Sequence, residues 1–293
     1  MERQLALIGF GEAARAFAPG LHAGLRAFDR KTDVDAFAAA KRAEMAAAGV
    51  AGAASAEAAL AGVEAALSLV TADQALTAAR ACGGLPRHAF WFDMNSVAPD
   101  TKRAAGLAVS AAGGRYVDVA VMAPVLPRRT AVPLLVSGPH AMAGADFLRA
   151  LGFADVTVSG AAIGDAAAIK MIRSVMIKGI EALSAECILA ADAAGVRDAV
   201  IASLDASWPG ADWGTRFDYN LDRAMVHGER RAAEMDEVVV TLDALGTGAD
   251  MSRAAAARQR ALGTLAVTPP DGLDAKLHVL APLVRAPVRE DAA

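Results

Sequence analysis

The chain has 293 residues, 55% of them hydrophobic, and a formal net charge of −4 at pH 7. This length suits one large or two medium domains, and the acidic balance argues against nucleic-acid binding as the main activity. No run of about twenty uncharged apolar residues occurs, so we expect no membrane span. The first residues enter an apolar run without a basic leader, which favours a cytoplasmic protein.

The two cysteines, Cys82 and Cys187, stand far apart and lack the spacing of a metal or redox motif. We therefore expect two buried thiols in a reducing compartment, with neither a disulfide nor a bound metal.

Apolar runs alternate with helical patterns through the first half of the chain. The patterns predict strands at 4–10, 25–28, 49–53, 65–70, 89–93, 115–121, 132–136 and 155–158. They predict helices up to about residue 19, at 33–48, 55–61, 73–82 and 140–151, and from residue 99. This alternation predicts an α/β domain with a doubly wound, mostly parallel sheet.

The first predicted strand ends in Gly9-Phe10-Gly11-Glu12-Ala13-Ala14, a G-x-G-x-x-A pattern that opens a helix. Gly9 permits the tight turn, Gly11 lets the backbone approach a pyrophosphate, and Ala14 lets the helix pack closely on the strand. The next strand ends at Asp29, twenty residues after Gly9. A glycine pattern alone is weak evidence, but strand, pattern, helix and terminal acid together predict a dinucleotide site.

Asp29 would accept hydrogen bonds from the ribose hydroxyls of the adenosine, which favours NAD. Arg30 and Lys31 follow directly and would suit the 2′-phosphate of NADP. The alternative is that Asp29 lies in the loop before the next helix and that both cations are solvated.

Ligands of open α/β sheets bind beyond the carboxyl ends of the strands. The residues predicted at those ends are Thr71, Asn95, Ser96 and the stretch Met122-Ala123-Pro124. For Asn95 and Ser96, ordinary loop formation and helix capping explain the residue types equally well.

Apolar positions recur at three- and four-residue steps from Gly164 to about Gly195, which predicts one helix of about thirty residues. Helices of this length often connect domains. We place a dinucleotide-binding domain at 1–160 and a helical domain at 161–293. Lys170 falls near the start of the long helix, where a catalytic side chain and a solvated surface charge are both possible.

The chain resembles the β-hydroxyacid dehydrogenase family, relatives of 6-phosphogluconate dehydrogenase, over residues 4–195. The resemblance is carried by the glycine loop, Val70-Thr71, Asp93-Met94-Asn95-Ser96 with Pro99, Tyr116-Val117-Asp118, and Gly164 with Lys170. It implies a Rossmann domain, an all-α C-terminal domain that often forms the dimer interface, and Lys170 as the general acid/base of hydride transfer. Val70, Thr71 and Asn95 are expected beside the cofactor, and Ser96, Met122 and Ala123 beside the substrate.

Two departures from the family concern the substrate. A Ser-Gly-Gly whose backbone cradles the substrate carboxylate is replaced by Met122-Ala123-Pro124, and proline has no N–H to donate. The family's Asn one turn after the lysine is replaced by Ser174, which can still bond a hydroxyl or a carbonyl. The core chemistry is expected to remain while the substrate differs.

Beyond residue 195 the sequence predicts only helices, with an aromatic loop at 208–219 that lines a substrate pocket, a subunit interface or a satellite core. The segment 227–235, His-Gly-Glu-Arg-Arg-Ala-Ala-Glu-Met, resembles the C-terminal domain of a little-characterised branch of the same superfamily. A charge run of this kind more often forms an exposed helix face with salt bridges. Our hypothesis is that His227 and Arg231 approach the substrate, with Arg231 in place of the missing carboxylate cradle.

We therefore predict an NAD(P)-dependent oxidoreductase that transfers hydride between nicotinamide and a small, anionic hydroxy acid or its keto form. A homodimer through the C-terminal helices is expected. An imine reductase of the same superfamily is an alternative, although such enzymes often lack the lysine. A dinucleotide-binding regulatory protein without turnover is a second alternative.

Overall fold

A computed structural model describes residues 3–284 of the chain. The described residues form two compact units, with the boundary between residues 172 and 173. The boundary falls inside helix α8 (Asp165–Ala193), the long helix that the sequence predicts from Gly164 to about Gly195. The predicted boundary, between residues 160 and 161, precedes this helix.

The first unit is built on one eight-stranded sheet with the order β3-β2-β1-β4-β5-β6-β7-β8. The strands are β1 (Gln4–Ile8), β2 (Gly24–Phe28), β3 (Ala51–Gly52), β4 (Ala65–Ser68), β5 (Phe90–Asp93), β6 (Arg115–Val121), β7 (Leu134–Ser137) and β8 (Val156–Gly160). All neighbouring strands are parallel except β6 and β7. This architecture confirms the predicted doubly wound, mostly parallel sheet.

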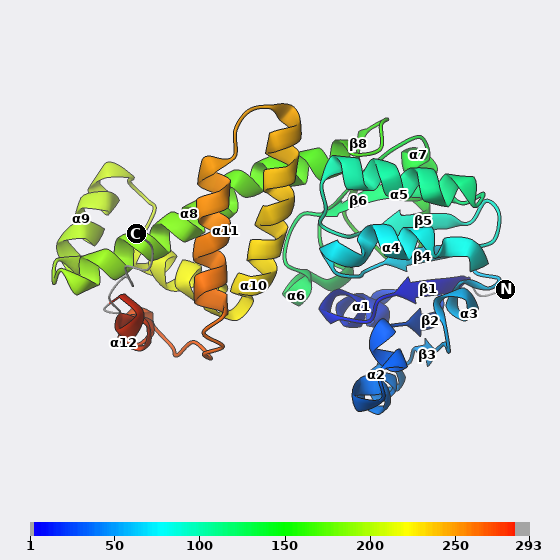
Figure 1. Cartoon of the computed structure of the whole chain (residues 1–293), viewed down its shortest axis with the longest axis horizontal. Helices are drawn as coiled ribbons and strands as arrows, with labels where there is room; N and C mark the ends of the chain where they lie inside the picture. The colour runs from blue at the N-terminus through cyan, green and yellow to red at the C-terminus, as the bar shows by residue number, and fades with distance from the viewer. Residues whose placement is uncertain (1–2, 285–293) are drawn as a thin grey trace, which may run out of the picture. The chain divides into compact units, whose positions relative to one another are not determined.

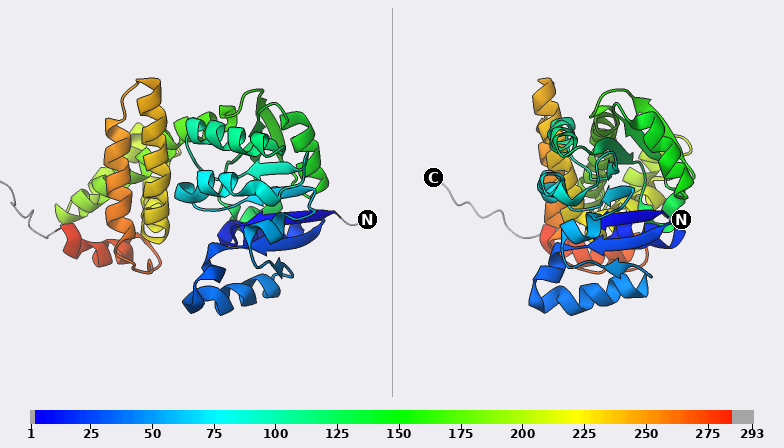
Figure 2. Two further views of the ribbon diagram at one scale, coloured as in Figure 1. Left: turned by 45° about the vertical axis from the view of Figure 1, so that its right-hand side comes forward. Right: turned by 90° about the vertical axis from the view of Figure 1, so that its right-hand side faces the viewer.

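Helices cover both faces of this sheet (Figure 2). Alternate residues of each strand point to opposite faces, so Phe90 and Phe92 of β5 belong to one apolar cluster and Trp91 to the other. The helices are α1 (Glu12–Phe17), α2 (Asp35–Ala47), α3 (Ala56–Leu60), α4 (Ala75–Arg80), α5 (Pro99–Ala111), α6 (Val125–Arg128) and α7 (Ala141–Ala150). Helices α1 and α7 contribute to the first cluster, and α4 and α5 to the second.

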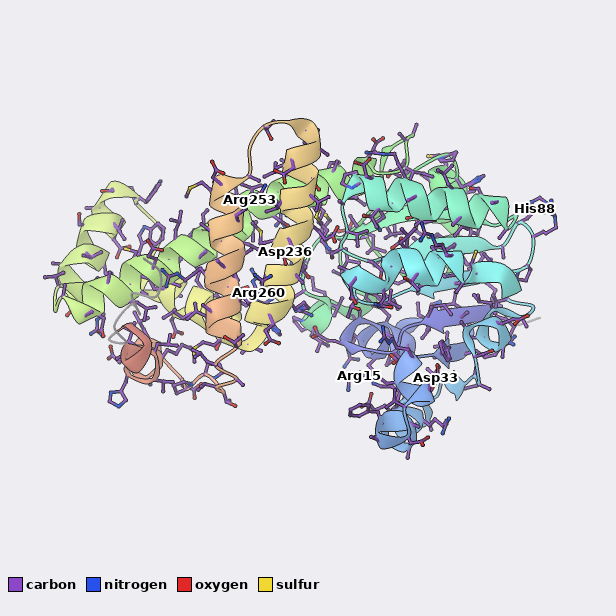
Figure 3. All side chains as sticks on the ribbon, in the orientation of Figure 1. Arg15, Asp33, His88, Asp236, Arg253 and Arg260 are labelled. Atoms are coloured by element: carbon purple, nitrogen blue, oxygen red, sulfur yellow. The ribbon has the colours of Figure 1, made fainter. Side chains whose placement is uncertain are left out.

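The second unit contains helices and, within its described residues, no strand (Figure 1). It comprises most of α8 together with α9 (Arg197–Ser207), α10 (Trp213–Leu245), α11 (Asp250–Gly263) and α12 (Leu273–Val284). Helices α10 and α11 pack side by side and are joined by an ion pair at 2.6 Å between Arg260 and Asp236 (Figure 3).

One prediction for this unit is wrong. Trp213, Phe217 and Tyr219 were expected in a loop, but they lie in the first turns of α10, whereas Trp208 lies just before it. Asp212 caps this helix, accepting a hydrogen bond from the N–H of Thr215 at 3.1 Å. Phe217 packs in the apolar core of the unit, with Trp213 against it, so the helix buries part of the aromatic segment.

The two cysteines are free thiols, and Cys82 is buried as expected. Cys187 is exposed on α8, so the expectation of two buried thiols was wrong for this residue. None of the helices within residues 3–284 is both long and apolar enough to cross a membrane.

Candidate active site

The glycine loop joins β1 to α1 at the carboxyl edge of the sheet. Gly9 has a φ of 91°, and a Cβ there would lie 2.7 Å from the carbonyl oxygen of Leu69, so only glycine fits. A Cβ on Gly11 would meet no atom within 4 Å. Gly11 is the N-cap of α1 and makes no side-chain capping bond, so the open space lies over the start of the helix. Such a start offers N–H donors to a phosphate.

Asp29, at the end of β2, contacts this loop directly. Its Oδ2 accepts the N–H of Phe10 at 2.8 Å, and its Oδ1 accepts the N–H of Lys31 at 2.9 Å. Lys41 of α2 donates to the carbonyl oxygen of Phe10 at 3.1 Å. The loop is therefore held by side chains from two neighbouring elements. Sequence reasoning missed Lys41, because a helical lysine ordinarily faces solvent.

The remaining members of the predicted cofactor set surround the same edge. Arg30 and Lys31 are exposed directly after Asp29, and Ala14 is buried where α1 packs on the sheet. Val70 is half-buried and Thr71 is exposed, both after β4. A hydrogen bond from the Thr71 side chain, followed by one from Gln74, lowers the pKa of Asp73. Glu12 and Ala13 open α1, both half-buried.

Lys170 and Ser96, which are 74 residues apart in sequence, meet in the first unit. The Lys170 Nζ donates to the Ser96 Oγ at 2.5 Å. Ser96 follows β5, and Lys170 lies in the second turn of α8. Both residues are half-buried.

Asn95 precedes this contact and is buried. Its Nδ2 donates to the Ser68 Oγ at 2.9 Å and to the Asp93 Oδ1 at 2.8 Å. These two acceptors fix the orientation of the amide, and its Oδ1 has no hydrogen-bond partner among the described residues. The buried strand end therefore presents one unused acceptor beside Ser96.

Met122 and Ala123 follow β6 at the same edge, both half-buried. The N–H of Met122 donates to the carbonyl oxygen of Pro133 at 2.9 Å, which closes the β6–β7 connection. Pro124 has no N–H. Of these three residues, only Ala123 therefore has a backbone N–H available, because that of Met122 is bonded to Pro133 and Pro124 has none.

Ser174, His227 and Arg231 belong to the second unit. Ser174 is buried and lies 3.4 Å from the Nζ of Lys178, which pairs with Glu234 of α10 at 2.6 Å. Arg231 is buried and donates to Glu181 of α8. Ser174 and Arg231 are thus part of internal polar contacts between α8 and α10, and His227 is half-buried on α10.

The segment 227–235 also has a packing role. A Cβ on Gly228 would lie 2.3 Å from the carbonyl oxygen of Gln259 and 2.7 Å from the Cα of Gly263. Helices α10 and α11 therefore approach each other closely through these two glycines. Ala232 and Met235 are buried on the same helix. Packing and ion pairs within the second unit therefore explain most of the residue types in the segment 227–235.

Comparisons with known proteins agree with this fold. Residues 191–262 match the model of a family described as a domain of unknown function (DUF1932). A conserved hypothetical protein from Sinorhizobium meliloti 1021 is 38% identical, with a TM-score of 0.74, over 96% of this chain and 97% of that chain. The conserved protein MTH1747, described as structurally similar to 3-hydroxyacid dehydrogenases, is 28% identical, with a TM-score of 0.69, over 89% and 97%. No curated protein matched the sequence.

More distant structures share the fold. The 3-hydroxyisobutyrate dehydrogenase of Mycobacterium tuberculosis, solved with L-serine, is 17% identical, with a TM-score of 0.73, over 98% of this chain and 100% of that chain. Psf3 in complex with NADP+ is also 17% identical, with a TM-score of 0.67, over 94% and 99%. The chain thus belongs to one family with the Sinorhizobium meliloti protein, has the fold of 3-hydroxyacid dehydrogenase-like proteins, and matches the DUF1932 domain at residues 191–262.

Proposed function

We propose that the protein is an NAD(P)-dependent oxidoreductase that interconverts a small hydroxy acid and its keto form. The observation that carries this proposal is the contact of the Lys170 amine with the Ser96 hydroxyl at the carboxyl edge of the sheet. The glycine loop lies at the same edge, and the likeness of MTH1747 to 3-hydroxyacid dehydrogenases supports the reaction class.

The residues of the glycine loop suit a dinucleotide. The space over Gly11 admits a pyrophosphate, and the uncapped start of α1 supplies donors for it. When bound, the nicotinamide accepts or returns the hydride. We propose NAD, because Asp29 ends β2 where a ribose hydroxyl would reach it. The exposed Arg30 and Lys31 are the residues that would select NADP instead.

Lys170 provides the acid/base group in this proposal. In the direction of oxidation, its neutral amine takes the proton of the substrate hydroxyl while the hydride leaves the same carbon and a C=O bond forms. The reverse direction returns that proton to the carbonyl oxygen. The Ser96 hydroxyl accepts a hydrogen bond from Lys170 and can donate its own hydrogen to the substrate oxygen. The two side chains therefore hold the reacting oxygen.

The carboxylate of the substrate requires donors other than the Met122-Ala123-Pro124 backbone. We propose that Ser174, His227 and Arg231 contribute to its binding. Arg231 already pairs with Glu181 in a buried contact, so binding an anion requires Arg231 to share or release this partner. A specific role for Arg231 predicts that Arg231→Lys raises KM, since a point charge does not replace the planar guanidinium.

The first experiment follows reduction of the cofactor by absorbance. Wild type, Lys170→Ala and Arg173→Ala are compared with a panel of 3-hydroxy acids, and NAD and NADP are run separately. Arg173→Ala removes an exposed cation three residues further along the same helix and serves as the control. We expect a loss of about 10²–10⁴ in kcat for Lys170→Ala only.

The other outcomes separate the alternatives. Reduction of cyclic imines without oxidation of hydroxy acids would identify an imine reductase. Tight binding of the cofactor without turnover of either panel would identify a binding protein. Activity that survives Lys170→Ala would contradict the proposed role of this lysine.

Gly11→Ala tests the cofactor site independently of the substrate. A Cβ fits at this position, so we expect the melting temperature to stay nearly unchanged and the cofactor Kd to rise, because the methyl group fills the space proposed for the pyrophosphate. Gly9→Ala is the contrasting variant, which should destabilise the fold itself. Unchanged cofactor affinity in a folded Gly11→Ala would place the dinucleotide elsewhere.

We also propose a homodimer formed by the helices of residues 173–284. These helices expose large apolar side chains, including those of Met176, Leu183 and Val240. Light scattering in solution would measure twice the mass of the chain, and the mass of a single chain would contradict the proposal.

A further inference from the structure

Lys102 of α5 is a charged side chain inside the first unit, with an exposed fraction of only 1%. Its Nζ lies 3.1 Å from the Oδ1 of Asp93 and 3.2 Å from the Oδ1 of Asp118. It also donates to the carbonyl oxygen of Asp93 at 2.6 Å. The two aspartates face each other on adjacent strands β5 and β6, so one ammonium group separates two buried carboxylates.

Asp93 connects this lysine to the loop that carries Ser96. Its Oδ1 accepts the backbone N–H of Asn95 at 3.0 Å and the side-chain Nδ2 at 2.8 Å. Its Oδ2 accepts the hydroxyl hydrogen of Tyr116 at 2.8 Å. Burial, followed by the charges of both aspartates, raises the pKa of Tyr116 well above its usual value, so this phenol remains a donor.

Asp118 connects the same lysine to the start of α8. Its Oδ2 accepts the backbone N–H groups of Gly164 and Ala167, each at 3.1 Å, and the hydroxyl hydrogen of Ser137 at 3.0 Å. The Ser137 Oγ accepts the N–H of Ala166 at 3.0 Å. The first N–H groups of a helix carry partial positive charge, so they stabilise the second carboxylate of the trio.

The network of Lys102, Asp93 and Asp118 therefore contacts both segments that form the Lys170–Ser96 pair. Asp93 holds the residue before Ser96, and Asp118 holds α8 within one turn of Lys170. We propose that Lys102 is a positioning residue that keeps these two segments together and so fixes the geometry of the amine and hydroxyl. The catalytic consequence rests on the proposed function, whereas the positioning itself does not.

The proposal can be tested on the whole chain without any substrate. Trace acetic anhydride acylates amines according to their accessibility and basicity, and mass spectrometry of peptides measures the labelling rate of each lysine. Lys102→Met removes the cation and leaves two carboxylates that repel each other. We expect the labelling rate of Lys170 relative to exposed Lys31 to shift to the value measured in Ser96→Ala, in which the contact is deleted.

Lys41→Met is the matched control, because Lys41 is also buried in the first unit but contacts Phe10 and Glu44. It should leave the relative labelling of Lys170 unchanged. If Lys102→Met does not fold, the double variant Lys102→Met/Asp93→Asn is measured instead, because it keeps the net charge of Lys102, Asp93 and Asp118 unchanged. Its relative labelling of Lys170 is then compared with that of Asp93→Asn alone. Relative labelling of Lys170 that is the same in wild type and in the folded variant would overturn the proposal.

Kinetics supply a second measurement if the protein turns over hydroxy acids. Misplacing reacting groups by about 1 Å can reduce the rate by about 100-fold. We expect kcat to fall by that order in Lys102→Met while the cofactor KM stays unchanged. A larger effect on cofactor KM than on kcat would contradict a role at Lys170. If the protein proves inactive, the labelling result alone decides the proposal.

Discussion

Both units contain a buried lysine that pairs with at least one carboxylate, and Lys102 and Lys178 differ in their surroundings. In the first unit, Lys102 lies between two aspartates whose other oxygens are occupied by a phenol, a hydroxyl and the first N–H groups of α8. In the second unit, Lys178 has one acidic partner, Glu234, whose side chain is partly exposed. The two carboxylates of the first network thus accept hydrogen bonds from side chains and backbone N–H groups of the first unit.

The second cluster is less well compensated. Burial lowers the pKa of Lys178, in opposition to Glu234, and the charge of Arg231 lowers it further. Burial also lowers the pKa of Arg231. Among the described residues, buried atoms without hydrogen-bond partners occur in both clusters: the Nε of Arg231 and the Oε1 of Gln259 in the second, and the Oδ1 atoms of Asn95 and Asp118 in the first, the latter 3.2 Å from the Lys102 Nζ. The comparison shows that two carboxylates offset the burial of Lys102, whereas a single carboxylate offsets that of Lys178 only in part.

The largest effect on the second cluster is expected for Glu181→Ala. This change leaves the Arg231 guanidinium buried without its acidic partner, and breaking a buried pair in this way costs about 3–5 kcal/mol. Urea unfolding would measure the loss. The double variant Glu181→Leu/Arg231→Met should recover most of it, because the apolar pair removes both buried charges. Equal stability of Glu181→Ala and wild type would show that water or another group already solvates Arg231.

A smaller effect is expected where the helices of the second unit touch. Gly228→Ala drives a methyl group into the backbone of α11, and overpacking of this kind costs about 1–3 kcal/mol. Gly179→Ala is the matched control on α8, because a Cβ there meets no atom within 4 Å and alanine favours a helix by about 1 kcal/mol. A melting temperature lowered by both substitutions, or by neither, would show that close packing does not explain the glycine.

The smallest effect concerns pH. Because the folded pKa of Lys178 lies below its unfolded value, the unfolded chain binds more protons between the two values. Burial of the charged Lys178 therefore lowers the free energy of unfolding by its full amount below the folded pKa. This loss disappears as pH rises towards the ordinary lysine pKa of about 10.4. Relative to Lys178→Met, wild type should therefore gain stability as pH is raised through this window. A relative loss would mean that Glu234 outweighs burial.

The sequence predicted the first unit better than the second, for physical reasons. Strands buried on both faces give apolar runs, and the spacing from Gly164 to Lys170 marks the start of α8. These signals predicted the sheet and the long helix. The contact between Lys170 and Ser96 joins residues 74 positions apart, so only the fold reveals it.

The missed residues are those whose environment depends on tertiary packing. Lys102 looks like a charge on an exposed helix, and Asp118 looks like one polar residue in a strand, yet both are buried together. The segment 213–219 was mistaken for a loop because glycine and aspartate flank its aromatics. The spacing of Trp213, Phe217 and Leu221 at four residues was the signal for a helix.

The most direct test of the central claim is chemical rescue of Lys170→Ala. If Lys170 transfers the proton, small primary amines added to the variant should restore kcat in proportion to their concentration and basicity. The Arg173→Ala control should not respond to them. Restored turnover that follows amine basicity is the predicted result. A variant that keeps wild-type kcat, or one whose lost activity no amine of any basicity restores while cofactor affinity is intact, would contradict the assignment of Lys170 as the acid/base group.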